Sequence, residues 1–219
     1  MGFDTFTKVC GQIAGNNASD GKSAKKYYYF MRVMGQDPSH TALEVALQTK
    51  PNFVILSEEV TARGMSLTDI VNEIADVVVA RADAGKNFGT ILVPDGLVCA
   101  IPELRIVVDE IDRVYRSSSE GIGIKRAADG RGLIAGRRSA EKERVLNELA
   151  VWIRALLCTL PEFFIDSLLL ERSSDGGVQK SLCETERLLA HLVDSELAVR
   201  KRRGTFKGTF TPMCSYLGE

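Results

Sequence analysis

The chain has 219 residues, 45% of them hydrophobic, so it is long enough to bury a substantial core in one large domain or two small ones. Its 28 basic and 29 acidic residues leave a net charge of −1. Because no overall field attracts a polyanion or an anionic lipid surface, this balance argues against nucleic acid and membranes as partners.

The cysteines are odd in number, widely scattered and never arranged as a CxxC pair; they are Cys10, Cys99, Cys158, Cys183 and Cys214. This spacing argues against a disulfide framework and against a zinc site. No apolar run approaches the roughly 20 residues that a membrane-spanning helix needs, and the N-terminus lacks the pattern of a signal peptide. We therefore expect free thiols in a soluble, cytoplasmic protein.

The first predicted element is a helix, because Phe6, Val9 and Ile13 recur at helical spacing close to the N-terminus. Residues 16–26 are polar, contain glycine and include Lys22, Lys25 and Lys26. We interpret them as a loop that leads into the next element.

Residues 27–34 form an aromatic and apolar run that is broken only by Arg32 and ends at Gly35, the pattern of a short buried strand and a tight turn. Asp37 as N-cap and Pro38 at the first helical position predict that a helix follows. Its broad apolar face is predicted at Ala42, Leu43, Val45, Ala46 and Leu47. Such a turn either binds an anion such as phosphate at the helix N-terminus or serves only as scaffold.

Residues 53–56 predict a second strand and residues 88–93 a third. Between them, Ser66 begins a long helix with Asp69 as its capping-box partner. The buried face of this helix is predicted at Leu67, Ile70, Val71, Ile74, Val77 and Val78. A further amphipathic helix follows over residues 102–114. Strands that alternate with helices predict an α/β fold with three layers, α/β/α, around a mostly parallel sheet.

Residues 117–139 are rich in serine, glycine and basic side chains, so they predict an exposed insertion. A helix over residues 141–160 follows, with Trp152 among its inward-facing side chains. These two segments make up the helical insertion that we expect at residues 117–160, after an α/β domain at residues 1–116.

Residues 165–170 predict another strand, followed by a turn at residues 173–177 and a short return at residues 178–179. A helix over residues 184–199 ends in a basic run at residues 200–203, which we interpret as a solvated face. Residues 206–217 predict the last strand. Residues 161–219 therefore return the chain to the α/β domain.

No catalytic constellation emerges from side-chain spacing, and His40 and His191 lie in no metal-binding motif. Glu58 and Glu59 follow the second strand, where a carboxylate can bind substrate, although solvated or helix-capping acids also explain them. Asp95 has a better context. It lies at the end of the third strand, at the sheet edge that also receives residues 34–36.

Blocks of sequence that carry a family resemblance cover nearly the whole chain outside the insertion. In chain order they are GFDT (2–5), SAKKY (23–27), MRVMG (31–35), SH (39–40), ALE-x-ALQT-x-PN (42–52), EEV (58–60), GKNFG (85–89), VPDGL (93–97), IPE (101–103), LLLER (168–172), VQ-x-S-x-x-ETE-x-LL (178–189) and FKG-x-F (206–210). With these blocks in this order, the chain resembles the pyrophosphate-dependent phosphofructokinases in their long, plant-like form.

The resemblance implies transfer of a phosphoryl group from pyrophosphate, with Mg²⁺, to fructose 6-phosphate, giving fructose 1,6-bisphosphate in glycolysis. It also implies that this chain is a fragment, the sugar-phosphate half. The donor loop and the aspartate that acts as general base in the family have no counterpart in it. We therefore expect no catalytic residue and no metal ligand here, with Mg²⁺ held mainly by the other half. The residues that select pyrophosphate or ATP as donor also lie in that half.

Substrate contacts are implied residue by residue. Lys26 and Tyr27 match a pair that reaches the substrate across a subunit interface in the family, which implies a homo- or hetero-oligomer. Met34 and Gly35 match the first two residues of the family's MGR substrate motif.

Two of the matched positions depart from the family pattern. Gln36 replaces the arginine of the MGR motif, which removes a forked cation able to engage phosphate. Asp95 stands where relatives have a glutamate that hydrogen-bonds sugar hydroxyls. These departures leave a second interpretation open, in which the chain is a non-catalytic regulatory subunit or a degenerate half of such an enzyme.

Overall fold

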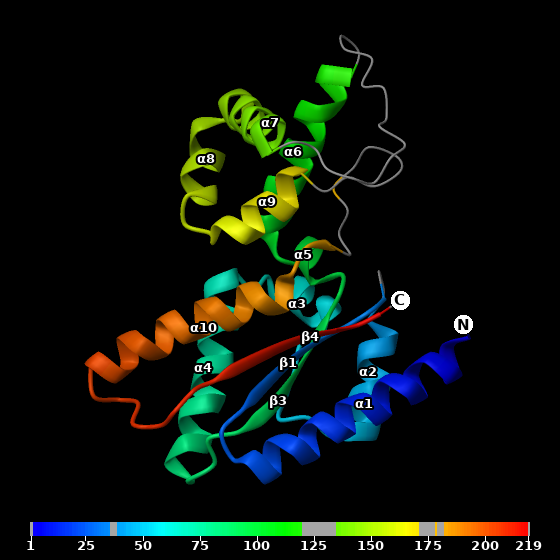
Figure 1. Ribbon diagram of the computed structural model, residues 1–219, viewed down its shortest axis with the longest axis vertical. Coiled ribbons are helices and arrows are strands. Elements are labelled where there is room, and N and C mark those ends of the chain that lie inside the picture. Colours follow the sequence, from blue (N-terminus) through cyan, green and yellow to red (C-terminus); the bar gives the residue numbers. More distant parts are fainter. Residues whose placement is uncertain (1, 36–38, 120–134, 171–177, 179–181, 219) are drawn as a thin grey trace. The chain divides into compact units, whose positions relative to one another are not determined.

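The computed structural model describes residues 2–35, 39–119, 135–170, 178 and 182–218 (Figure 1). The chain forms two compact units, one made of Met1–Glu103 and Thr185–Glu219 and the other of Leu104–Glu184. The three-part division predicted from the sequence stays a prediction. None of the helices in the described ranges combines the length and the apolar character that a membrane crossing requires.

The first unit is built on four parallel strands in the order β2-β3-β1-β4. The strands are β1 (Tyr28–Val33), β2 (Phe53–Val54), β3 (Gly89–Pro94) and β4 (Pro212–Leu217). The helices of this unit are α1 (Phe3–Ala24), α2 (His40–Thr49), α3 (Ser57–Arg63), α4 (Leu67–Asp83), α5 (Leu97–Ala100) and α10 (Thr185–Arg202). The four strands expected in these places are confirmed, although β2 and β4 are shorter than predicted.

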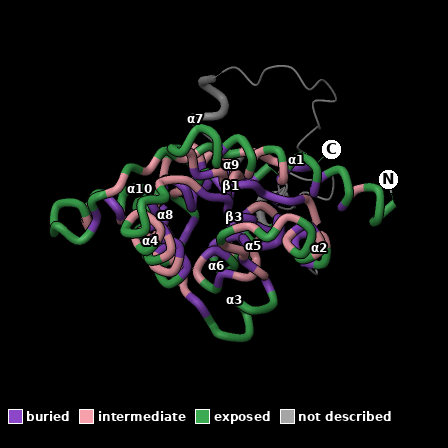
Figure 2. Tube along the Cα trace, turned by 90° about the horizontal axis from the view of Figure 1, so that it is seen from below, coloured by how far each residue is buried: buried purple, intermediate pink, exposed green. Residues whose placement is uncertain are grey.

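Helices cover both faces of the sheet. On one face, α1 and α2 enclose a buried apolar cluster that consists of Cys10, Ala14, Met31, Val33, Ala42, Val45, Leu92 and Leu217. On the other face, the rings of Tyr28 and Phe30 lie 5.3 and 6.1 Å from that of Phe210. There α10 packs on β1 and β4, with α4 beside it. The three-layer α/β/α arrangement is therefore confirmed, and Figure 2 shows buried segments along β1 and β3.

The loop expected at residues 16–26 is wrong, because α1 continues as one helix to Ala24. Its buried face consists of small side chains, among them Cys10, Gly11 and Ala14, so the apolar spacing of larger residues misled the prediction. Val9 and Ile13, which gave the predicted helical spacing, are 42% and 41% exposed. A Cβ on Gly11 would lie 2.4 Å from Oε1 of Gln48 on α2, so the glycine permits a close approach of the two helices.

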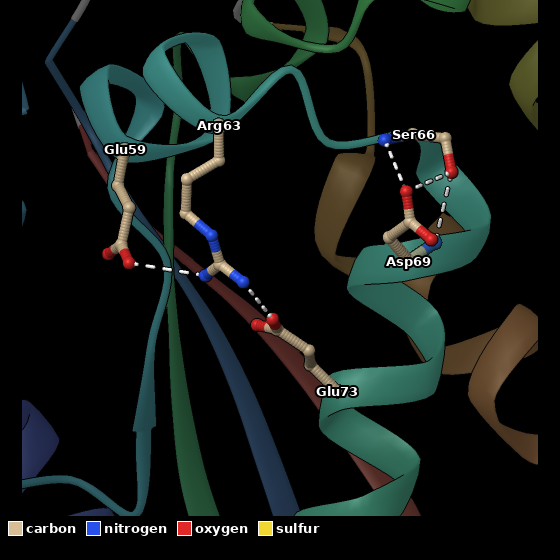
Figure 3. A network of polar contacts seen from close by, with 5 residues as sticks. All are labelled: Glu59, Arg63, Ser66, Asp69 and Glu73. Carbon is tan, nitrogen blue, oxygen red and sulfur yellow. Dashed lines mark hydrogen bonds and ion pairs between the residues drawn. The ribbon is translucent and has the colours of Figure 1, made fainter.

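The outer edge of the sheet is covered by charged side chains. β2 is one of the two edge strands of the described sheet. A pocket of about 110 Å³ beside it is lined by apolar residues, among them residues 53–56, and by Glu59, Arg63 and Glu73. Figure 3 shows Arg63 reaching from α3 between the two carboxylates, at 3.3 Å from Glu59 and 2.7 Å from Glu73. Charges on an edge oppose pairing with a strand of another chain.

The described residues of the second unit are mostly helical, although Val178, in the predicted short return, is a β-bridge residue. This unit contains most of α6 (Pro102–Ser119), together with α7 (Ala135–Glu148), α8 (Val151–Leu157) and α9 (Glu162–Leu170). The prediction of a strand at residues 165–170 is wrong, because a short apolar run is equally typical of a buried strand and of a buried helix. In α9, Phe164, Leu168 and Leu169 are fully buried, which is a helical spacing.

Other predictions in this unit also need correction. The single helix expected at residues 141–160 breaks between α7 and α8, and Trp152 is 55% exposed instead of inward-facing. The ends of the expected insertion are helical, because α6 extends to Ser119 and α7 begins at Ala135. The centre of the insertion, the turn at residues 173–177 and Gln179 lie outside the described residues.

The capping box at the start of α4 is confirmed and predicts a measurable effect on stability. The Oγ atom of Ser66 accepts from the backbone N–H of Asp69 at 3.2 Å, and the Asp69 carboxylate accepts from the N–H of Ser66 at 3.0 Å (Figure 3). We expect Ser66→Ala to lower the free energy of unfolding by about 1 kcal/mol in urea denaturation. The control Thr68→Ala, at an exposed position two residues after Ser66, should change the free energy of unfolding by less than about 0.5 kcal/mol. Equal losses in the two variants would contradict the capping role.

Candidate functional site

The carboxyl ends of β1, β3 and β4 meet at one edge of the sheet. The backbone N–H of Met34 donates to the carbonyl of Leu217 at 2.9 Å, and that of Asp95 donates to the carbonyl of Val33 at 3.1 Å. Because the strands are parallel neighbours, the turn at Gly35 and the turn at Asp95 lie side by side. The structure thus brings together three of the predicted site residues, while Gln36 lies outside the described residues.

Gly35 occupies a backbone position that disfavours any other residue. Its φ is +153°, and a Cβ at this position would lie 2.4 Å from Oγ1 of Thr41. The Thr41 hydroxyl in turn donates to the carbonyl of Met34 at 2.8 Å. The close approach of the β1 turn to the start of α2 therefore depends on glycine.

A buried guanidinium organises this edge. Arg32 on β1 is 3% exposed, and its Nη1 lies 2.5 Å from Oδ1 of Asp95, after β3. Its Nε lies 2.7 Å from Oε2 of Glu186, in the first turn of α10. The ring of Tyr216 on β4 stacks on the guanidinium at 4.1 Å. One side chain therefore links three strands and a helix.

Sequence reasoning treated Arg32 only as an interruption of an apolar strand and missed Glu186 and Tyr216 as members of the site. The available signal was Arg32 itself. A charge inside a strand that is otherwise buried requires a partner, because an unpaired buried charge is costly. The identity of the partners could not be read from the sequence, since they lie 63 and more residues away along the chain.

The environment of Asp95 sets its ionisation. Burial raises the pKa of the Asp95 carboxyl above its ordinary value of 3.8, while the positive charge and the hydrogen bond of Arg32 act in the opposite direction. Burial also raises the pKa of Tyr216, so its phenol stays protonated at neutral pH. Arg32 therefore acts against burial and favours the ionised form of Asp95, which can accept a hydrogen bond.

The N-terminus of α2, which the sequence offered as a phosphate site, already holds a carboxylate. Helix α2 begins at His40 with Ser39 as its N-cap, so the N-cap predicted at Asp37 is displaced; Asp37 and Pro38 lie outside the described residues. Oε1 of Glu58 accepts from the N–H of Ser39 at 2.6 Å, and Oγ of Ser39 accepts from the N–H of Ser57 at 3.1 Å. An anion at this helix end would therefore lie beside the carboxylate of Glu58.

Lys26 and Tyr27 lie at the opposite end of the sheet, where the strands begin. The carbonyl of Tyr27 accepts from the N–H of Gly89 at 3.0 Å, where β1 and β3 begin, and Nζ of Lys26 lies 4.9 Å from the Tyr27 ring. At about 3.3 Å per residue, Tyr27 is roughly 25 Å from Gly35. The structure of one copy thus does not bring this pair to the turns at Gly35 and Asp95.

Metal ligands do not gather in the described part of the chain. No group of three or more His, Cys, Asp or Glu side chains there is arranged to hold a metal ion. His40 and His191 are both exposed.

Comparison with known proteins shows relatives along the whole chain. It is 42% identical over 219 residues to the pyrophosphate–fructose 6-phosphate 1-phosphotransferase subunit alpha 2 of Arabidopsis thaliana, covering 32% of that protein. It is 37% identical over 218 residues to the pyrophosphate–fructose 6-phosphate 1-phosphotransferase of Treponema pallidum, and 36% identical over 218 residues to the subunit beta of Ricinus communis, covering 36% of each. The chain spans about a third of the length of these relatives. No family model matches it.

The cap that Glu58 supplies predicts a pH-dependent loss of stability. The hydrogen bond from the backbone of Ser39 lowers the pKa of Glu58 below its ordinary value of 4.5. The stability that the ionised Glu58 contributes is therefore present above pH 4.5 and is lost as the pH falls through the lower pKa of the folded state. We expect Glu58→Ala to reduce the free energy of unfolding at pH 7 by about 1 kcal/mol in urea denaturation. Glu59→Ala, which removes an exposed ion pair with Arg63, should cost less. A Glu58→Ala loss that does not shrink in acid would count against the cap.

The raised pKa of Asp95 predicts a pH dependence of stability opposite in sign to that of Glu58. The folded carboxyl binds a proton more readily than the unfolded one, so its ionisation makes the wild type less stable as the pH rises through the folded pKa. The unfolding free energy of the wild type minus that of Asp95→Asn should therefore decrease from pH 4 to pH 7 in urea titrations. A difference that stays flat or increases would show that Asp95 is not held in a desolvated site.

Proposed function

We propose that this chain supplies part of the fructose 6-phosphate site of a pyrophosphate-dependent phosphofructokinase. Its whole length aligns with about a third of the length of such enzymes. The observation that carries the proposal is the meeting of Met34, Gly35 and Asp95 at one sheet edge. In parallel α/β sheets, ligands bind at the carboxyl ends of the strands.

The proposed role of Asp95 is to accept a hydrogen bond from a sugar hydroxyl. A buried carboxylate makes a stronger hydrogen bond than a neutral acceptor, and its position at a strand end gives it a fixed backbone. The turn at Gly35 would bring backbone close to the sugar, since only a residue without a Cβ fits beside Thr41. Neither residue supplies a general base or a donor site, so this chain would be inactive by itself.

In the complete enzyme, we infer that phosphate passes from pyrophosphate, with Mg²⁺ bound by other residues, to fructose 6-phosphate. The product, fructose 1,6-bisphosphate, would place the protein in cytoplasmic glycolysis. ATP stays an alternative donor, because no residue described here selects between the two.

Lys26 and Tyr27 support an oligomer in this proposal. Since they lie far from Gly35 in one copy, they could serve a sugar site only in a neighbouring subunit. Some relatives are named as alpha and others as beta subunits. We propose that this chain assembles with copies of itself or with a related subunit, and that the pair completes the neighbour's site.

One sequence feature favours a second candidate, a regulatory subunit that binds the sugar phosphate without turning it over. Gln36 stands where the family motif has arginine, so a contact to phosphate would lack a charged donor. A glutamine still donates a hydrogen bond but brings no positive charge. A site of this kind would retain sugar recognition and lose affinity for the phosphate group.

Restoring the arginine tests both candidates. We expect Gln36→Arg to tighten the binding of fructose 6-phosphate by about 10- to 100-fold in isothermal titration calorimetry, because a charge-assisted hydrogen bond contributes about 1.5–3 kcal/mol. Gln12→Arg, which adds the same charge at an exposed position of α1, is the control and should leave the affinity unchanged.

The outcomes separate the proposals. Binding that tightens only in Gln36→Arg supports a sugar-phosphate site at this edge. An equal gain in both variants would reduce the effect to net charge. If neither the wild type nor Gln36→Arg binds fructose 6-phosphate, the proposed function fails.

A further inference from the structure

The guanidinium of Arg32 contacts three protein groups, two carboxylates and one aromatic ring. Nη1 faces Asp95, Nε faces Glu186, and the Tyr216 ring covers one face of the plane. The side chains of Arg32, Asp95 and Glu186 are 3%, 5% and 7% exposed. Arg32 is therefore committed to protein groups and is not available as a cation for a ligand's phosphate.

The arrangement fixes the orientation of Asp95. A short aspartate in a turn has several staggered rotamers, and a bond from a rigid guanidinium selects the one whose Oδ1 points at Nη1. Glu186 and Tyr216 in turn hold the plane of the guanidinium, so the position of the Asp95 carboxylate is set by residues from β1, β4 and α10. A carboxylate held in this way meets a ligand without losing side-chain entropy.

We propose that Arg32 is a positioning residue for substrate, which holds the Asp95 carboxylate in the orientation that receives a sugar hydroxyl, with Glu186 and Tyr216 orienting Arg32 in turn. This inference rests on the proposed function and deepens it. It assigns the arginine in the strand to the carboxylate of Asp95 rather than to the phosphate of the sugar.

Arginine suits this role better than lysine. Its planar fork can face two carboxylates in fixed directions and stack on a ring at the same time, whereas an ammonium group presents a single point of charge. Among the described residues, Arg32 on β1 faces Asp95 directly, the charge of Asp95 acts on Tyr216 on β4, and Glu186 on α10 faces Arg32. In this part of the chain, Asp95 and Glu186 are the carboxylates that pair with Arg32, so removing Arg32 takes a positive charge away from both.

Calorimetry and NMR together test the proposal on the full chain. The variants are Arg32→Met, which keeps an apolar side chain of similar length, Arg32→Lys, which keeps the charge, and Arg200→Met as matched control. Arg200 also lies between two carboxylates, 2.5 Å from Asp76 and 2.9 Å from Glu196, but at the other end of α10. The two readouts are the dissociation constant for fructose 6-phosphate and the pKa of the Asp95 carboxyl from carbon-detected titration.

We expect Arg32→Met to weaken fructose 6-phosphate binding by about tenfold or more, as loss of one well-oriented charged hydrogen bond does. The same variant should raise the pKa of Asp95, because Arg32 lowers it in the wild type. Arg32→Lys should recover part of both effects. Arg200→Met should change neither, although it removes an arginine with two acidic partners.

A folded Arg32→Met protein that binds fructose 6-phosphate as tightly as the wild type would overturn the inference and leave the proposed function standing. Failure of the wild type to bind would overturn both. If Arg32→Met does not fold, Glu186→Gln replaces it. This variant should lower the pKa of Asp95, since the guanidinium is no longer shared with a second carboxylate. A pKa of Asp95 that is the same in Glu186→Gln and the wild type would contradict the coupling.

Discussion

The buried guanidinium of Arg32 is the constraint on which the edge of the sheet depends. Its pairs with Asp95 and Glu186 connect the end of β3 and the start of α10 to β1, and Tyr216 adds β4. Removing one partner from a buried ion pair typically costs about 3–5 kcal/mol, because the remaining charge is left without compensation. The same contacts that make this edge rigid also determine where a carboxylate is presented, so the stability of the edge and its proposed use in binding have one physical origin.

The charged groups described at the carboxyl ends of the strands favour hydroxyl groups over phosphate. Asp95 and Glu186 share Arg32, and Glu58 occupies the N-terminus of α2. A phosphate dianion at the described part of the edge would meet carboxylates whose counter-ion is already engaged. Under our proposal, positive charge for the phosphate must come from residues that lie elsewhere, such as Lys26 of a neighbouring subunit. A site whose residues come from several parts of a larger protein is consistent with a chain that spans about a third of its relatives' length.

Local patterns predicted much of the fold. The apolar runs that became β1 and β3, the capping box at Ser66 and the helix over residues 184–199 were all readable, because each depends on neighbours in the sequence. Contacts between distant segments were not. The small-residue face of α1, the helix that replaced a strand at residues 165–170, and the exposure of Leu47 on α2 at 65% follow from packing against other elements. The basic run after residue 199, expected to be solvated, includes Arg200 paired with Asp76 for the same reason. At the candidate site, Asp95 was predicted from the family resemblance and stays a prediction, whereas its pairing with Arg32 became apparent only from the structure.

The most direct measurement of the central claim is an amide NMR titration of the full chain with fructose 6-phosphate. The account predicts saturable shift changes concentrated at Gly35, at Asp95 and at the side-chain Nε–H of Arg32, with little change along the β2 edge near Arg63. Changes centred on the β2 edge, or shifts at Gly35 that inorganic phosphate alone reproduces, would contradict a sugar-recognition site built around Arg32.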